Sequence, residues 1–136
     1  MIEAYLRSID ELLSTSVVVS DVEVVRRSIR DTDLEKVLNY RYRVTLAYGG
    51  LIEMTERLLE RQGTLEVTKY RHHWQDGQGR LIKRWDNAPH YPALDTFPHH
   101  LHDGEDRVVQ NPAVTGLEVL QRILAEIETQ GDTTGA

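Results

Sequence analysis

The sequence predicts an α+β domain in which an antiparallel β-meander of about five strands is flanked by an N-terminal and a C-terminal helix. Apolar residues recur at helical spacing at both ends of the chain, whereas the middle shows strand-like alternation and glycine-containing turns. The chain has 136 residues, an ordinary length for one domain. We therefore predict a single domain over residues 1–130 and a frayed C-terminal tail over residues 131–136.

The first helix is predicted over residues 2–14. Ile2, Leu6 and Ile9 fall on one face of this segment, and charged residues fill the opposite face. A Ser-Thr-Ser run then ends the helical pattern. The next segment, 17–29, is rich in valine, whose branched β-carbon favours a strand.

The clearest strand is YRYRVTLAY, residues 40–48. Its large residues alternate with Arg41, Arg43 and smaller residues, which is typical of a strand with one buried face. Gly49-Gly50 follows and suits a tight hairpin turn. The segment 51–59 also fits a helix, but the preceding turn favours a returning strand.

A second hairpin is predicted from LEVTKYRHHW, the turn QDGQG and RLIKRW. The following segment contains three prolines, each of which removes a backbone donor, so we expect an irregular loop. Residues 106–109 are expected to add a short edge strand. A final helix follows Pro112, with an apolar stripe in TGLEVLQRILAEIE and either Asn111 or Thr115 as its cap.

Composition excludes several classes of protein. The chain has no cysteine, so disulfides, thiolate metal sites and cysteine nucleophiles are excluded. No apolar run approaches the roughly 20 residues that cross a membrane. The N-terminal segment is acidic and amphipathic, unlike a signal peptide. We therefore expect a soluble, cytoplasmic, bacterial protein with no membrane association.

The charge distribution is uneven. The net charge is −6, which argues against a nucleic-acid partner, but the segments 26–43 and 61–86 each carry six Lys or Arg and only three Asp or Glu. Phosphate binding depends on a local basic face rather than on the total charge. Arg41 and Arg43 either bind phosphate or form a solvated strand face with carboxylates on neighbouring strands.

Candidate chemistry is concentrated in residues 85–104, WDNAPHYPALDTFPHHLHDG. This segment holds four of the six histidines and three of the four prolines. RNA cleavage without a metal needs a base for the 2′-hydroxyl, an acid for the leaving oxygen and cations near the phosphate. Histidine can perform both proton transfers near neutral pH, and arginine binds phosphate through paired hydrogen bonds.

Two other interpretations of this segment stay open. His100 and His102 would point the same way from an extended chain, and Asp86, His90 or Asp103 could complete a metal site. In the second interpretation the segment is structural. Its aromatic and proline residues would then pack the loop onto the sheet as a stiff cover, and its histidines would bond to local carbonyls.

The long run YRHHWQDGQGRLIKRWDNAPHYPALDTFPHHLHDG resembles the TumE-like proteins of bacterial toxin–antitoxin pairs. The resemblance covers roughly residues 36–127 and is weakest over 51–62. It implies a toxin encoded beside a helix-turn-helix-type antitoxin and suspected of acting on RNA, but it brings no assigned catalytic set. The matching positions are Arg84, Asp86, Asn87, Ala88, Pro89, His90, Phe97, Pro98, His99 and His100, with His102 just beyond.

We therefore predict the toxin of a type II pair, acting on RNA as a metal-independent ribonuclease or translation inhibitor, without a cofactor. A non-enzymatic module that binds nucleic acid or protein, and a metal-dependent hydrolase that uses the His-rich loop, are the alternatives. A homodimer is left open. The predicted catalytic residues are His90, His99, His100, Arg84 and Asp86; the predicted substrate-binding residues are Arg71, Lys83, Asn87, Tyr70 and His72; the metal ligands, if a metal binds, are His100, His102, His90 and Asp86.

Overall fold

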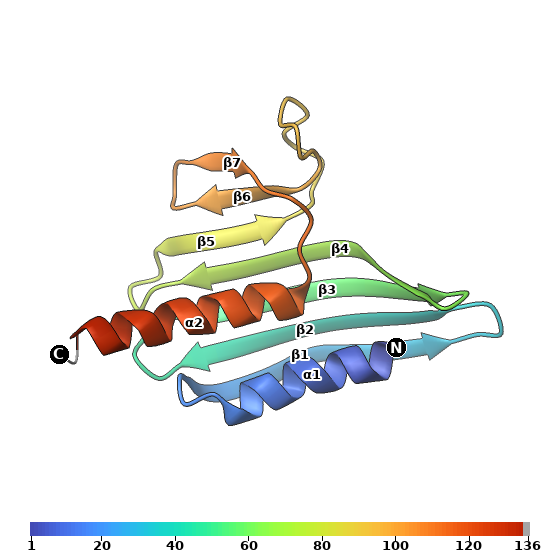
Figure 1. The fold of residues 1–136 in the computed structure, drawn as a ribbon, viewed down its shortest axis with the longest axis horizontal. Coiled ribbons are helices and arrows are strands. Elements are labelled where there is room, and N and C mark those ends of the chain that lie inside the picture. The colour runs from blue at the N-terminus through green and yellow to red at the C-terminus, as the bar shows by residue number, and fades with distance from the viewer. Residues whose placement is uncertain (135–136) are drawn as a thin grey trace.

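The computed structural model describes residues 1–134, with side chains described over residues 1–130. Seven antiparallel strands form one sheet in sequence order, and both helices lie against the same face of it (Figure 1). The elements are α1 (Ile2–Thr15), β1 (Val19–Asp31), β2 (Lys36–Leu46), β3 (Leu51–Arg61), β4 (Thr64–Gln75), β5 (Leu81–Asp86), β6 (His100–Asp103), β7 (Val108–Gln110) and α2 (Gly116–Thr134).

The core lies between the helices and the sheet. Alternate residues of β2, among them Tyr40, Tyr42 and Val44, are buried against the helices, whereas Arg41 and Thr45 point to the opposite face. This separation follows from the strand period of two, which sends successive side chains to opposite faces. The sheet therefore has one face covered by helices and one open face.

The predicted α+β fold is confirmed, with a difference in strand number. Both helices, the strand over 51–59 and the short edge strand β7 are present. The meander has seven strands rather than about five, because His100–Asp103 forms β6 within the segment predicted to be an irregular loop. The predicted frayed tail of residues 131–136 falls partly in α2, whose backbone helix reaches Thr134, and partly on residues 135–136, which lie outside the described residues.

A buried carboxylate connects the start of α2 to the core. Glu56 on β3 accepts hydrogen bonds from the hydroxyls of Tyr5 and Tyr40, both at 2.6 Å, and from the backbone N–H of Gly116 at 2.9 Å. Burial raises the pKa of Glu56 above its ordinary value, against the opposing effect of these hydrogen bonds. Thr115, not Asn111, caps α2, because its Oγ1 accepts the backbone N–H of Glu118 at 3.1 Å.

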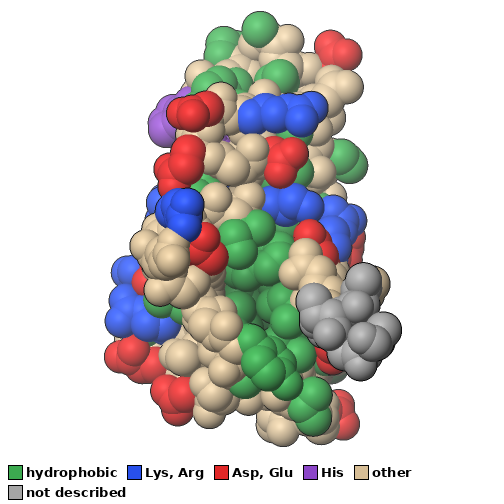
Figure 2. Space-filling model, turned by 90° about the vertical axis from the view of Figure 1, so that its left-hand side faces the viewer, with side chains coloured by type: hydrophobic (Ala, Val, Ile, Leu, Met, Phe, Trp, Pro, Cys, Tyr) green, Lys and Arg blue, Asp and Glu red, His purple; other side chains and the backbone are tan. Residues whose placement is uncertain are grey.

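One end of the molecule carries a patch of hydrophobic side chains. Figure 2 shows hydrophobic side chains gathered in the middle of the end that carries the β2–β3 and β4–β5 turns. A small hollow of about 200 Å³ opens there, and Leu46, Trp74 and Ile127 are among the residues that line it. Neither α1 nor the described part of α2 is long and apolar enough to cross a membrane.

Candidate active site on the open face

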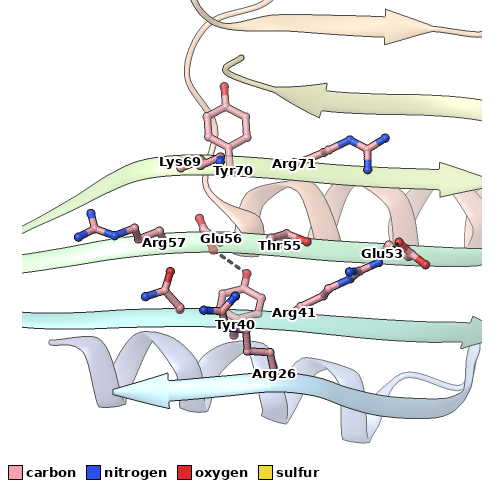
Figure 3. Close-up of a pocket in the computed structure, with 11 residues that line it drawn as sticks. Arg26, Tyr40, Arg41, Glu53, Thr55, Glu56, Arg57, Lys69, Tyr70 and Arg71 are labelled. Carbon is pink, nitrogen blue, oxygen red and sulfur yellow. Dashed lines mark hydrogen bonds and ion pairs between the residues drawn. The ribbon is translucent and has the colours of Figure 1, made fainter. Parts of the chain in front are cut away.

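Two neighbouring hollows lie on the open face of the sheet. The first, of about 490 Å³, spans β1 to β4, and the second, of about 640 Å³, extends from β4 over β5 and β6 to residues 87–91. Lys69 and Arg71 of β4 line both hollows, so the two hollows adjoin each other. Figure 3 shows the first hollow with α2 behind the sheet.

The first hollow is rich in cations. Glu53 is a half-buried carboxylate that lines it and accepts hydrogen bonds from Arg41 at 3.2 Å and from Arg43 at 3.1 Å. Partial burial disfavours the Glu53 carboxylate, but these hydrogen bonds outweigh burial and lower its pKa. The cationic residues that line this hollow are Arg26, Arg41, Arg57, Lys69 and Arg71.

Four of these cations have no ion-pair partner among the described residues. No carboxylate there lies within 4.0 Å of the charged nitrogens of Arg26, Lys69 or Arg71, and Arg57 bonds to the hydroxyl of Thr68 instead. Arg41 and Arg43, by contrast, form the cross-strand ion pairs expected of a solvated strand face. Unpaired cations beside one another carry an electrostatic cost that a bound anion relieves, so the face is suited to phosphate.

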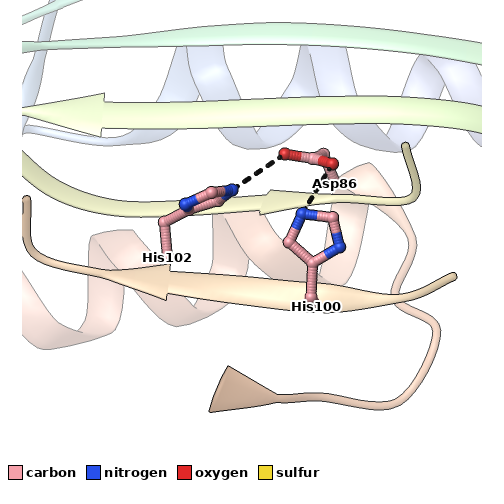
Figure 4. Close-up of side chains that lie close together, drawn as sticks. All are labelled: Asp86, His100 and His102. Carbon is pink, nitrogen blue, oxygen red and sulfur yellow. Dashed lines mark ion pairs between the residues drawn. The ribbon is translucent and has the colours of Figure 1, made fainter. Parts of the chain in front are cut away.

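A compact cluster lies at the bottom of the second hollow. Asp86 ends β5 and is directly opposite His100 on β6, and His102 projects from β6 on the same face, two residues further along. The Nε2 atom of His100 lies 2.9 Å from Asp86 Oδ1, and Nε2 of His102 lies 3.5 Å from Asp86 Oδ2 (Figure 4). Only 6% of Asp86 and 1% of His100 are exposed.

The ring of His100 is held from its other side. Its Nδ1 atom lies 2.9 Å from the carbonyl oxygen of Pro98, which can only accept, so Nδ1 carries a proton and donates. Asp86 Oδ1 accepts the backbone N–H of Ala88 at 3.0 Å. Although Nε2 of His100 is close to Asp86, it forms no hydrogen bond of acceptable geometry within the described residues.

Surrounding groups define the state of the cluster. Desolvation, helped by the nearby charge of Arg84, lowers the pKa of His102, so its imidazole is neutral at pH 7. Arg84 Nε lies 3.6 Å from Asp86 Oδ2. The ring of Tyr91 packs edge-on against His100 and His102, with centroid distances of 4.9 and 5.9 Å. Tyr91 therefore limits the rotation of both imidazole rings.

The structure brings together seven of the eleven site residues predicted from sequence. Asp86 and His100 lie in the cluster, Arg84 lies beside it, and Arg71 of β4 is directly opposite Asp86 in the sheet. His102, predicted only as a metal ligand, belongs to the same cluster. Two further predicted residues, His90 and Asn87, line the second hollow.

The remaining predicted residues face the helices. His72 is fully buried, and the ring of Tyr70 stacks against it with a centroid distance of 5.8 Å. Tyr70 also shares a 2.7 Å hydrogen bond with Nδ1 of His99. Lys83 lies 3.6 Å from Glu126 of α2. For Tyr70, His72 and Lys83, the strand period sends the side chain away from the open face, although their sequence neighbours lie on it.

Sequence reasoning overlooked three contributors to the open face. Arg26, Arg57 and Lys69 line the first hollow but were not assigned to a site. Lys69 and Arg71 share the spacing of two that would have placed them on one strand face. Arg26 and Arg57 carry no such local signal, since their position depends on strand pairing with β2 and β4.

The family of the protein follows from comparison with known families. A family model described as Toxin TumE matches residues 9–130, which includes both hollows and the cluster. The chain belongs to the Toxin TumE family. It is thus the toxin component of a toxin–antitoxin system, and this role implies an antitoxin partner. No curated protein matches the chain. No solved structure matches it either.

Proposed function

We propose that this toxin acts on RNA and cleaves its phosphodiester backbone on the open face of the sheet. The observation that carries the proposal is the pair of adjoining hollows, which place the unpaired cations Arg26, Lys69 and Arg71 beside the Asp86–His100–His102 cluster. Nucleic-acid affinity comes largely from cations that bind the phosphate backbone. An extended groove next to candidate acid/base groups fits a single-stranded substrate.

In this proposal Arg71 and Arg84 hold the scissile phosphate beside the cluster. The 2′-oxygen attacks phosphorus, the bond from phosphorus to the 5′-oxygen breaks, and the 2′-proton must leave while the 5′-oxygen gains one. In this proposal His90, which is exposed on the wall of the second hollow, accepts the 2′-proton as the general base. An imidazole of the cluster, on the other side of the phosphate, donates a proton to the 5′-oxygen as the general acid.

The predicted catalytic role of His99 receives less support. Its Nδ1 is bonded to the Tyr70 hydroxyl, and its ring stacks on Tyr70 at 5.7 Å, on the side of the sheet that faces the helices. Partial burial is the main cause that lowers the pKa of His99, and the neighbouring His100 lowers it further. We therefore assign His99 to the support of Tyr70.

The experiment is induction of the toxin in a bacterial host, with and without the neighbouring gene, followed by sequencing of new RNA 5′ ends. We expect growth arrest, relief by a neighbour that encodes a helix-turn-helix-type antitoxin, and new RNA ends. Arg71→Ala should reduce RNA cleavage by about 10- to 100-fold, because a charge-assisted hydrogen bond contributes about 1.5–3 kcal/mol.

Arg80→Ala is the matched control, since Arg80 lies in the exposed β4–β5 turn and pairs with Asp76. It should retain arrest and cleavage. RNA binding that weakens with salt, without any new RNA ends, would replace the ribonuclease by a non-enzymatic inhibitor of translation. Arrest that is unchanged in Arg71→Ala would contradict a role for the open face.

A further inference from the structure

We propose that Asp86, His100 and His102 bind one divalent transition-metal ion. This inference goes beyond the proposed action on RNA and does not depend on it, because metal binding is measurable without RNA. The sequence left a metal site as an alternative to metal-independent catalysis. The arrangement of the three side chains favours that alternative.

The donor atoms lie at suitable distances from one another. One carboxylate oxygen and one nitrogen from each imidazole all lie within 4.8 Å of one another. His100 Nε2 lies 2.9 Å from Oδ1 of Asp86, and His102 Nε2 lies 3.5 Å from Oδ2. In a tetrahedral zinc site with ligands at roughly 2.0–2.2 Å, the donor atoms are about 3.3–3.6 Å apart. Small side-chain shifts therefore place all three donors around one ion.

His100 has the hydrogen bonding of a metal-bound histidine. A ligating imidazole commonly donates its other ring N–H to a backbone carbonyl, which fixes the tautomer and the ring orientation. Nδ1 of His100 does this toward Pro98 at 2.9 Å. Its Nε2 is then an acceptor, buried without a hydrogen-bond partner in the described structure and aimed at an Asp86 oxygen that is also an acceptor.

Two acceptors that face each other in a buried site need a cation between them. A proton could fill this role if His100 were an imidazolium. A metal ion additionally engages His102, whose Nε2 faces the other oxygen of Asp86 at 3.5 Å. Arg84 also approaches this oxygen, but its Nε forms no hydrogen bond within the described residues.

The ligand set selects the class of ion. Two imidazole nitrogens and one carboxylate oxygen suit Zn²⁺ and its first-row neighbours, whereas Mg²⁺ and Ca²⁺ prefer oxygen ligands alone. Three protein ligands leave a coordination position for water or substrate, as in catalytic sites. Asp86 and His102 line the second hollow, so this position is reached from the phosphate-binding face. Such an ion would polarise a phosphoryl oxygen.

The test is titration of the purified chain, stripped with a chelator, with Zn²⁺ by calorimetry and with Co²⁺ by visible absorption. We expect one ion per chain and the absorption of Co²⁺ bound to nitrogen and oxygen ligands. Asp86→Asn and His102→Gln should each weaken Zn²⁺ binding by at least about a hundredfold. Both substitutions preserve side-chain volume, and circular dichroism checks that the variants fold.

His73→Gln is the matched control, because His73 of β4 lies on the open face of the sheet, as the cluster does, but is not part of the cluster. Its Zn²⁺ affinity should equal that of the wild type. Failure of the folded wild type to bind Zn²⁺, Co²⁺ or Mn²⁺ would overturn the cation site, as would equal binding by the two cluster variants. Nitrogen NMR that shows His100 protonated on both ring nitrogens at pH 8 with Zn²⁺ present would also overturn the metal site. A proton, not a metal ion, would then lie between His100 Nε2 and Asp86.

These outcomes are separate from those of the RNA experiment. Zn²⁺ binding without RNA cleavage contradicts the ribonuclease and retains the metal site. RNA cleavage by a chain that binds no metal contradicts the metal site and retains the ribonuclease.

Discussion

At the scale of single residues, the histidines have different surroundings because some lie on the open face of the sheet and others on the face covered by the helices. His100 and His102 lie on the open face with Asp86, whereas His72 is fully buried under the helices. Neither ring nitrogen of His72 has a hydrogen-bond partner within the described structure. Burial lowers the pKa of His72 to about 3, so its imidazole is neutral in the folded protein at all but acidic pH.

His72 should make stability depend on pH. Its unfolded pKa is about 6.5, so below that value the unfolded chain binds a proton that the folded chain excludes. Stability is therefore full above pH 6.5 and falls as the pH drops toward 3, by up to about 1.4 kcal/mol per pH unit. His72→Phe should flatten this fall, as measured by urea unfolding between pH 7 and 4. His73→Gln is the control and should keep the wild-type slope of unfolding free energy against pH. Equal slopes for the wild type and His72→Phe would contradict the claim that His72 causes the loss of stability.

At the scale of elements, α2 begins at a position that only glycine fits. A β-carbon on Gly116 would lie 2.5 Å from the Tyr40 hydroxyl oxygen, 2.6 Å from Glu56 Oε1 and 3.2 Å from His72 Cε1. The same N–H of Gly116 bonds to Glu56. The helix is thus positioned by a buried polar network rather than by its own capping residue alone.

Gly116→Ala should destabilise the protein by about 2 kcal/mol or more. Alanine is favoured over glycine in a helix by roughly 1 kcal/mol, but overpacking of this kind costs about 1–3 kcal/mol and also displaces the Glu56 hydrogen bonds. Chemical denaturation measures the change. Gly77→Ala provides the comparison, because a β-carbon there meets its neighbours no closer than 3.6 Å, and we expect a change within about 0.5 kcal/mol. A Gly116→Ala variant that is more stable than the wild type would contradict this prediction. It would show that the hydrogen-bonded network around Glu56 shifts to accept the added methyl group at little cost.

The unpredicted strand β6 also belongs to this scale. HLHD has too few residues and too little hydrophobic alternation to signal a strand, and it follows a proline-rich segment. It becomes a strand because β5 and β7 pair with it on both sides. This pairing, absent from local sequence preference, is what places His100 opposite Asp86.

At the scale of the whole molecule, a chain of net charge −6 presents a basic open face. The strands contribute arginine and lysine to this face, while carboxylates such as Glu3, Glu118 and Glu126 belong to the helices on the other side. Total charge therefore gives the wrong sign for the surface that we propose binds RNA.

RNA binding should depend on salt in proportion to the cations used. Each neutralised phosphate of a single strand contributes about 0.7 to the slope of log affinity against log salt. Arg26→Ala combined with Lys69→Ala should lower that slope by about 1.4, measured by fluorescence anisotropy with a labelled single-stranded RNA. Arg122→Ala on the exposed side of α2 should leave the slope unchanged. Equal slopes for all proteins would place the RNA elsewhere.

The sequence by itself determined the elements and their periodicity. The spacing of Leu6 and Ile9, the alternation of residues 40–48 and the glycine turns predicted helices and strands, because these signals are local and arise from backbone geometry. The motif in residues 84–102 likewise pointed to the toxin family that the family comparison confirmed. It also located the dense polar segment that contains Asp86 and His100.

Only the tertiary structure decided which of these polar residues act together. Lys83 and Arg84 are adjacent in sequence, yet one faces Glu126 of α2 and the other faces Asp86. The physical reason is strand register: a shift of one residue exchanges the two faces of a strand, and register is set by pairing with distant strands. The same long-range pairing across β4, β5 and β6 joins Arg71, Asp86 and His100 into one site.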